Sequence, residues 1–226
     1  MRVLITAGST QTPIDKVRAI TNIFKGKTGT DIAYYFADKS HNVTLITSRP
    51  EIMEGMLKED GWPMPNLTVI KYTTFNELMQ LMKAEIVNGK YDLIIHSAAV
   101  SDYKVDGVFQ MNAVNDLSEL NSEAKIPSGK ELYIKVSPTE KIVDKIKGEW
   151  GFTGKLVMFK LQVGMSRNEL KRVARASMLR SNADMIIANC LEWANKEAYV
   201  IGRTGRPTKV SRNNIGSEIG RRIIIK

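Results

Sequence analysis

Residues 4–10, Leu4-Ile5-Thr6-Ala7-Gly8-Ser9-Thr10, have the pattern of a buried strand that ends in a glycine and two hydroxyl side chains. A polar segment follows and leads to Gly26-Lys27-Thr28-Gly29, where the sequence predicts the start of a helix. A strand that ends beside a helix N-terminus leaves backbone N–H groups without partners, and these donors together with the helix dipole favour an anion. The opening of the chain therefore predicts a phosphate-binding site built from a strand, a loop and a helix.

Two familiar phosphate-binding motifs do not fit this stretch. The dinucleotide fingerprint G-x-G-x-x-G needs further glycines, but Gly8 is followed by Ser9-Thr10-Gln11, and we expect the hydroxyls of Ser9 and Thr10 to act as donors instead. Gly26-Lys27-Thr28 resembles the end of a P-loop, yet Thr21 stands where that motif has its first glycine, and no strand directly precedes it. The site is therefore expected to follow neither pattern.

Composition restricts the class of protein. The chain has 226 residues and 43% hydrophobic residues, enough for one α/β domain spanning residues 1–226. No stretch approaches the roughly 18 consecutive apolar residues of a membrane span, and the N-terminus lacks a signal-peptide pattern, so we expect a cytoplasmic protein with no membrane partner. The lone cysteine, Cys190, excludes an intramolecular disulfide and a cysteine-based zinc cluster.

The formal charge of +9 indicates an anionic partner. The basic residues are spread along the chain and are densest near its C-terminus. A small substrate rich in phosphate is favoured over nucleic acid, because the predicted site is a loop without the stacked aromatic residues that single strands require. We therefore expect no nucleic-acid partner.

The order of predicted elements is typical of a doubly wound α/β protein. Strands are predicted at residues 3–6, 42–47, 67–72, 92–97, 132–135, 156–160, 185–188, 199–201 and 208–210. Helices are predicted to follow residue 28, to follow capping boxes at residues 74–77, 137–140 and 166–169, and to close the chain at 214–225. The expected fold is a three-layer, Rossmann-like, mostly parallel sheet with a small antiparallel part at the C-terminus.

Two segments show little periodicity. Residues 50–66 contain three prolines and are expected to be irregular. Residues 104–129 are expected to form a long loop, and a loop of that length in a compact domain usually serves function or assembly.

Several further residues are candidates for the site because they follow predicted strands. Small Ala99 permits the close approach of a flat group, and Asp102 offers two acceptor oxygens or serves as a turn residue. Lys125 and Lys160 either neutralise phosphate or are solvated surface groups. Phe159 either stacks on a base or fills the core.

Four separated motifs together resemble one family. The first runs from Ile5 to Thr10, with Pro13-Ile14-Asp15, Val17-Arg18, Ile20-Thr21-Asn22 and Gly26-Lys27-Thr28-Gly29; the others are Ser97-Ala98-Ala99-Val100-Ser101-Asp102-Tyr103, Ala124-Lys125-Ile126 and Phe159-Lys160-Leu161. Their order and spacing over nearly the whole chain resemble phosphopantothenoylcysteine synthetase, also called phosphopantothenate-cysteine ligase. The flavin-dependent decarboxylase half of many bacterial members is not expected here, so the resemblance is to the free-standing form and implies no flavin.

The resemblance implies a fold and a reaction. It implies a Rossmann-like sheet with a ribokinase-like extension and a homodimer in which the partner contributes to the site, with residues 104–129 reaching toward it. The implied activity is a step of coenzyme A biosynthesis: 4'-phosphopantothenate attacks the α-phosphate of a nucleoside triphosphate, and the acyl-nucleotide then reacts with L-cysteine. CTP is the expected nucleotide, giving acyl-CMP, with ATP as the alternative and Mg²⁺ as the companion ion whose protein ligands are unknown.

The resemblance also implies roles for particular residues. The acyl and phosphopantothenate centre is implied for four residues, Arg18, Asn22, Gly26 and Lys125. The nucleotide site is implied for seven residues, Gly8, Ser9, Thr10, Ala99, Asp102, Phe159 and Lys160. The chain departs from the family pattern at Phe24-Lys25-Gly26, where Ser-Ser-Gly is common, and at Ser177 and Ser181, where CTP-using bacterial members tend to have lysines.

Two other classes of function stay open. An NAD(P)-dependent oxidoreductase would use the same kind of sheet, but it needs a dinucleotide fingerprint and an acidic residue after the second strand, where Thr47-Ser48-Arg49 stands. A basic nucleic-acid-binding module would bind with a steep dependence on salt.

Overall fold

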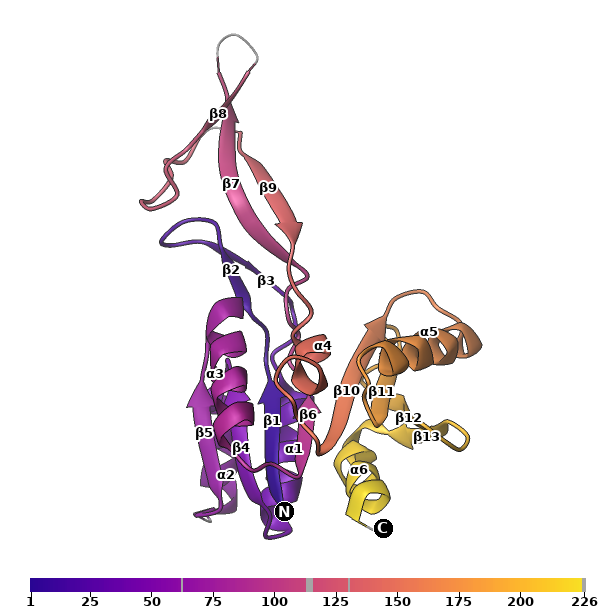
Figure 1. The fold of residues 1–226 in the computed structure, drawn as a ribbon. Helices are drawn as coiled ribbons and strands as arrows, with labels where there is room; N and C mark the ends of the chain where they lie inside the picture. Colours follow the sequence, from indigo (N-terminus) through magenta and orange to yellow (C-terminus); the bar gives the residue numbers. More distant parts are fainter. Residues whose placement is uncertain (62, 113–115, 130, 225–226) are drawn as a thin grey trace.

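The computed structural model describes residues 1–61, 63–112, 116–129 and 131–224. Within them the main sheet has eight strands in the order β13-β12-β11-β10-β6-β1-β4-β5 (Figure 1). Its strands are β1 (Arg2–Ala7), β4 (Asn42–Thr47), β5 (Leu67–Lys71), β6 (Leu93–His96), β10 (Lys155–Gln162), β11 (Met185–Cys190), β12 (Glu197–Gly202) and β13 (Thr208–Ser211). The six neighbouring strands β11, β10, β6, β1, β4 and β5 all pair parallel. Strand β12 pairs antiparallel with β11, and β13 pairs antiparallel with β12. The predicted mixed α/β class is confirmed, including the antiparallel pair near the C-terminus.

Helices cover both faces of this sheet and give the predicted three layers. The helices are α1 (Lys27–Asp38), α2 (Pro50–Asp60), α3 (Phe75–Asn88), α4 (Ile142–Lys147), α5 (Arg167–Arg180) and α6 (Ile215–Ile224). Helices α1, α2 and α6 contribute buried apolar residues to the core on one face, and α3, α4 and α5 to the core on the other. Residue 225, the predicted end of the last helix, lies outside the described residues. No helix in the described part of the chain is both long and apolar enough to span a membrane.

The predicted helix starts have mixed outcomes. The capping box at Thr74 is confirmed, because its side chain accepts from the Glu77 N–H while Glu77 bonds back to the Thr74 backbone. Ser166 likewise accepts from the Glu169 N–H at the start of α5. The prediction at residues 137–140 is wrong, because Ser137 and Pro138 end strand β9 and α4 begins only at Ile142 without a side-chain cap.

The irregular segment predicted at residues 50–66 is also wrong over most of its length, since it contains α2. Pro50 occupies the first turn of this helix, where a missing N–H costs nothing, and Gly61 ends the helix in a left-handed conformation. Met53 is its one fully buried side chain, so the apolar periodicity is weak in the sequence.

Two small antiparallel elements rise from the carboxyl end of the main sheet. The polar segment after Gly8 folds as a hairpin of β2 (Gln11–Pro13) and β3 (Ala19–Thr21). Beyond it, β7 (Tyr103–Met111), β8 (Leu117–Glu119) and β9 (Tyr133–Pro138) form a three-stranded sheet, here called the arm, which projects away from the main sheet in Figure 1. The loop predicted at 104–129 is therefore wrong for β7 and β8; residues 113–115 lie outside the described part.

Candidate functional site

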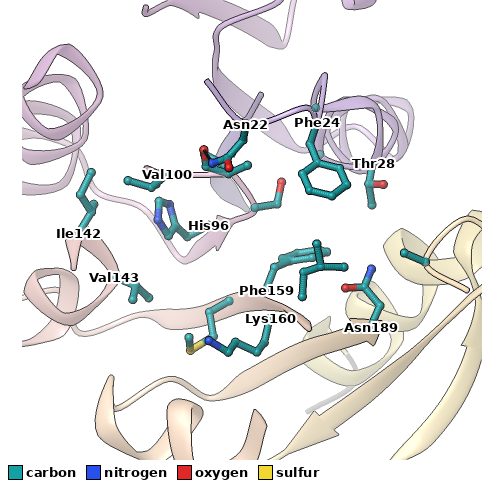
Figure 2. Close-up of a pocket in the computed structure, with 18 of the residues that line it drawn as sticks. Asn22, Phe24, Thr28, His96, Val100, Ile142, Val143, Phe159, Lys160 and Asn189 are labelled. Atoms are coloured by element: carbon teal, nitrogen blue, oxygen red, sulfur yellow. Dashed lines mark hydrogen bonds between the residues drawn. The ribbon is translucent and has the colours of Figure 1, made fainter. Parts of the chain in front are cut away.

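A cavity of about 570 Å³ lies at the carboxyl ends of β6, β10 and β11, beside the N-terminus of α1 (Figure 2). This is where an open parallel sheet binds its ligands, because strand order changes direction there and loops diverge. Its walls come from five regions, namely residues 22–29, 96–102, 140–143, 158–161 and 177–195, and from Arg212.

Two glycines bring the start of α1 against the end of β1. Gly8 and Gly26 both have positive φ, 85° and 88°. A Cβ on Gly26 would lie 2.3 Å from the Gly8 backbone N, and one on Gly29 would lie 2.3 Å from Ser97 Oγ. Because Gly26 supplies no side-chain cap, the first N–H groups of α1 remain available where Gly26, Lys27, Thr28 and Gly29 line the cavity.

Basic side chains outnumber acidic ones around this cavity. The basic residues are Lys25, Lys27, Lys141, Lys160, Arg180 and Arg212, and the acidic ones are Asp102 and Glu140. Each of these carboxylates already pairs with a lysine, Asp102 with Lys141 and Glu140 with Lys145. Together with the helix dipole, this charge distribution suits a phosphate-bearing ligand.

Six of the predicted site residues line this cavity. They are Asn22, Gly26, Ala99, Asp102, Phe159 and Lys160. The Asn22 amide donates to the Ala99 carbonyl at 3.0 Å, which ties the end of the hairpin to the loop after β6. Phe159 packs against the α1 side of the core and also lines the cavity, so it contributes to the core, while its contact with a base stays a prediction.

Ser9 and Thr10 bond to protein groups beside the cavity. The Ser9 N–H donates to Ser48 Oγ at 3.0 Å, and the Ser9 hydroxyl lies 3.1 Å from that of Thr21. Thr10 is fully buried and its hydroxyl accepts from the Ser101 N–H at 2.8 Å. Within this chain these hydroxyls therefore hold together the loops that surround the ligand space. Ser9 and Asn22 also line a second, polar cavity of about 520 Å³.

Arg18 and Lys125 do not line either cavity. Arg18 pairs with Asp15 and donates to the Ile126 carbonyl at 2.7 Å, while the Ile126 N–H donates to Asp15 at 3.0 Å. The Arg18 guanidinium holds the pKa of Asp15 well below its usual range. This cluster docks the segment that carries Lys125 onto the β2–β3 hairpin, and Lys125 itself is exposed.

Sequence reasoning gave no role in the site to four residues, His96, Asn189, Phe24 and Arg212, that line the cavity. His96 is 7% exposed, its Nδ1 lies 2.9 Å from Thr6 Oγ1, and burial lowers its pKa to about 4. Both His96 and Asn189 lie at the carboxyl ends of parallel strands, a position that could have identified them. No such signal marks Phe24, or Arg212, whose Nε donates to Thr28 Oγ1 at 3.1 Å.

The described residues contain no group of three or more His, Cys, Asp and Glu side chains that could hold a metal ion. The cavity carboxylates are engaged by lysines, as described above. The described cavity residues thus offer no ready-made cluster of ligands for Mg²⁺ without a bound phosphate.

Comparison with known proteins points in one direction. Residues 1–214 match the family described as DNA/pantothenate metabolism flavoprotein C-terminal domain. The coenzyme A biosynthesis bifunctional protein CoaBC of Thermococcus kodakarensis is 32% identical over 205 residues, which are 91% of this chain and 45% of that protein. The corresponding CoaBC of Methanocaldococcus jannaschii is 30% identical over 84% of this chain and 40% of its own length. The chain thus spans less than half the length of these curated relatives.

Solved structures with this fold cover the whole chain. The DNA/pantothenate metabolism flavoprotein from Streptococcus pneumoniae is 30% identical and has a TM-score of 0.84. The match covers 100% of this chain and 99% of that one. A Cab2 H337A mutant in complex with phosphopantothenate-cysteine has a TM-score of 0.74 at 18% identity, covering 99% of this chain and 86% of that one. At that identity the likeness to Cab2 concerns the fold.

Proposed function

Because this chain belongs to the DNA/pantothenate metabolism flavoprotein C-terminal domain family, we propose that residues 1–226 act as one ligase domain. It joins 4'-phosphopantothenate to L-cysteine in coenzyme A biosynthesis. The observation that carries the proposal is the cavity at the start of α1, where free helix N–H groups and six basic residues face the same space as Asn22. A nucleoside triphosphate and an acyl group can meet there.

The proposed chemistry has two steps. A carboxylate is a poor acyl donor at neutral pH, so its oxygen first attacks the α-phosphorus of the triphosphate, pyrophosphate leaves, and an acyl-nucleotide forms. The amine of cysteine then attacks the acyl carbon, the bond to the nucleotide oxygen breaks, and the nucleoside monophosphate leaves as the amide forms. CTP is the proposed nucleotide and acyl-CMP the intermediate, with ATP as the alternative.

Each part of the cavity has a proposed task. The α1 N-terminus and the basic residues bind and neutralise the phosphates, including the pyrophosphate that leaves. Asn22 bonds to the acyl oxygen, and Phe159 contacts the nucleoside. Gly8 lets α1 approach the end of β1, and the hydroxyls of Ser9 and Thr10 keep the loop in place. We expect Mg²⁺ to enter on the triphosphate oxygens, since the part of the chain that the structure describes offers no cluster of metal-binding side chains.

The site is proposed to be completed by a second copy of the chain. Lys125 lies in the connection between β8 and β9 of the arm and lines neither cavity of its own chain. The arm also exposes several large apolar side chains, Tyr103, Met111, Leu117, Tyr133, Ile134 and Val136. A homodimer formed through the arm would cover this surface and bring Lys125 of one copy to the cavity of the other.

The decisive experiment measures pyrophosphate release from the purified protein with CTP, ATP, GTP and UTP in parallel. We expect release only when 4'-phosphopantothenate is present, and more release when cysteine is added. Failure of every triphosphate to turn over with that acid would refute the ligase. Reduction of a nicotinamide cofactor, or salt-dependent binding of a DNA duplex, would instead favour one of the other two classes of function.

Asn22→Ala tests the proposed role of the amide. We expect the variant to release pyrophosphate in a single turnover at nearly the normal rate, but to form the amide roughly 10²-fold more slowly, because the acyl oxygen loses its hydrogen-bond donor. Asn76→Ala, at an exposed position on α3, is the matched control. An equal loss in both half-reactions would show that Asn22 does not act on the acyl group.

A further inference from the structure

One buried side chain at the cavity has a hydrogen-bonding group without a protein partner. His96 ends β6, is 7% exposed and lines the cavity. Its Nδ1 is bonded to the hydroxyl of Thr6 at 2.9 Å. Among the described residues, no partner contacts its second nitrogen, Nε2. Nε2 is not among the fully buried atoms that lack a partner, so it is open to the cavity and can donate to a ligand there.

The hydrogen bonds around Thr6 define which nitrogen of His96 carries the proton. Thr6 Oγ1 accepts from the Ala98 backbone N–H at 3.2 Å. Among the described residues, His96 Nδ1 is the one acceptor within reach of the Thr6 hydroxyl proton. The hydroxyl therefore donates to Nδ1, and the proton of the neutral ring lies on Nε2. Burial lowers the pKa of His96 to about 4, which keeps the ring neutral at physiological pH. His96 thus offers a neutral N–H donor.

The surroundings of His96 differ from the phosphate-facing half of the cavity. Figure 2 shows His96 on the same side as Val100, Ile142 and Val143, across from Phe24 and Thr28. Val100, Ile142 and Val143 belong to the core beneath α3, α4 and α5 or pack against it.

A second buried polar group borders the cavity from α5. Ser177 is 8% exposed and lines the cavity, and its hydroxyl contacts no partner among the described residues. Val100, Ile142 and Val143 with these two neutral polar groups offer a packing surface for a flat heteroaromatic ring, and Lys141, Lys160 and Arg180 line the cavity from the same segments.

We propose that this half of the cavity holds the nucleobase of the bound triphosphate, and that His96 determines nucleotide preference by donating a hydrogen bond from Nε2 to a ring nitrogen or carbonyl oxygen of the base. The inference rests on the proposed function, because it needs a nucleotide in the cavity. Phosphates at the α1 N-terminus place the base at the opposite end of the same molecule. The neutral N–H of His96 pairs well with a neutral acceptor on the base. The carboxylate and the phosphates, which are charged, pair more strongly with lysine and arginine side chains.

The first experiment observes the ring directly. The sequence contains two histidines, His41 and His96, so protein labelled with ¹⁵N-histidine shows two imidazole rings, which His41→Gln assigns. We expect His96 to be the Nε2–H tautomer in the free protein, and its Nε2–H resonance to shift when CTP or ATP is added without the acid. An Nδ1–H tautomer, or a His96 signal that no nucleotide moves, would overturn the proposal. This readout does not need turnover, so it separates failure here from failure of the ligase.

The second experiment measures kcat/KM for CTP, ATP, GTP and UTP in variants of His96. His96→Met removes the donor and puts an apolar side chain in its place. We expect kcat/KM for the preferred nucleotide to fall roughly tenfold relative to the other three, which is the effect of one lost hydrogen bond at a buried site. His96→Gln keeps an N–H donor and should retain the order of preference. Thermal unfolding checks that both variants fold, and His41→Met is the matched control.

The pattern across nucleotides decides the outcome. An equal loss for all four triphosphates with a higher KM for the acid would place His96 at the acid and overturn the proposal. Thr6→Val should act in the same direction as His96→Met but less strongly, because it releases the ring without removing it. Thr47→Val, at a buried threonine on the neighbouring strand β4, should leave the preference unchanged.

Discussion

The main sheet and the arm are both made of strands, yet they differ in the contacts that stabilise them. In β1 the residues after Arg2 are all buried, and helices cover both faces of the sheet. In β9 almost every residue is exposed or half-exposed, on both faces. The main sheet and its helices, here called the body, are therefore stabilised by their own core. The arm has little core of its own apart from Val108 and must gain stability from contacts at its base or from a partner.

Polar contacts at its base attach the arm to the body. Asp15 accepts from the Ile126 N–H, Arg18 donates to the Ile126 carbonyl, and the hydroxyl of Thr12 donates to the Tyr103 carbonyl at 3.2 Å. Such contacts are directional but few, so the arm can be positioned without being buried. The body thus forms the cavity, whereas the arm presents exposed side chains to its surroundings.

The largest effect is expected where the body is least tolerant. Gly26→Ala places a Cβ against the Gly8 backbone in a left-handed conformation, and we expect a loss of activity of about 10²-fold or more, because the start of α1 must move from the phosphates. Gly205→Ala is the control: its φ is +84°, but its Cβ would meet nothing within 4 Å, so it should cost about 1–2 kcal/mol in unfolding free energy and little activity. Similar activities for the two variants would show that the close contact between Gly8 and Gly26 does not shape the site.

A smaller effect is expected from a charge on the arm. Val136→Glu should weaken dimerisation roughly tenfold or more, because it would bury a carboxylate at the proposed contact, while the thermal stability of the body changes little. Sedimentation velocity at several concentrations measures this directly. Val87→Glu, at an exposed valine on α3, should leave the oligomeric state unchanged. A Val136→Glu protein that sediments like the unmodified chain would remove the arm from the interface.

The smallest effect is expected from mixing two inactive proteins. If Lys125 acts on the cavity of the other copy, combining Asn22→Ala with Lys125→Ala chains creates mixed dimers with one intact site, and activity should return to about a quarter of the normal value. Each variant alone should stay nearly inactive. A mixture no more active than its components would place Lys125 and Asn22 in a site formed by one chain.

Most of the body could be predicted from the sequence. Burial on both faces of the parallel strands leaves uninterrupted apolar runs, and residues 42–47 were placed at the observed bounds of β4. Helix α2 was missed because one buried methionine carries its packing, and β7 and β8 were missed because an exposed sheet has no apolar alternation to detect. The rule that ligands gather at strand ends correctly brought together Ala99, Asp102, Phe159 and Lys160, and the family resemblance added Asn22, although the roles of all five stay predictions.

The mixed α/β class, the family and the approach of Gly8 to the N-cap of α1 at Gly26 can all be predicted from the sequence, because local apolar patterns and glycine positions act over short distances. The folded structure is needed to show that the hydroxyls of Ser9 and Thr10 face protein groups and that His96 keeps an unpartnered donor at the cavity. Both depend on atoms that lie far apart in the chain. Hydrogen bonds between such distant loops leave no periodicity in the sequence, so they become visible only once the strands are side by side.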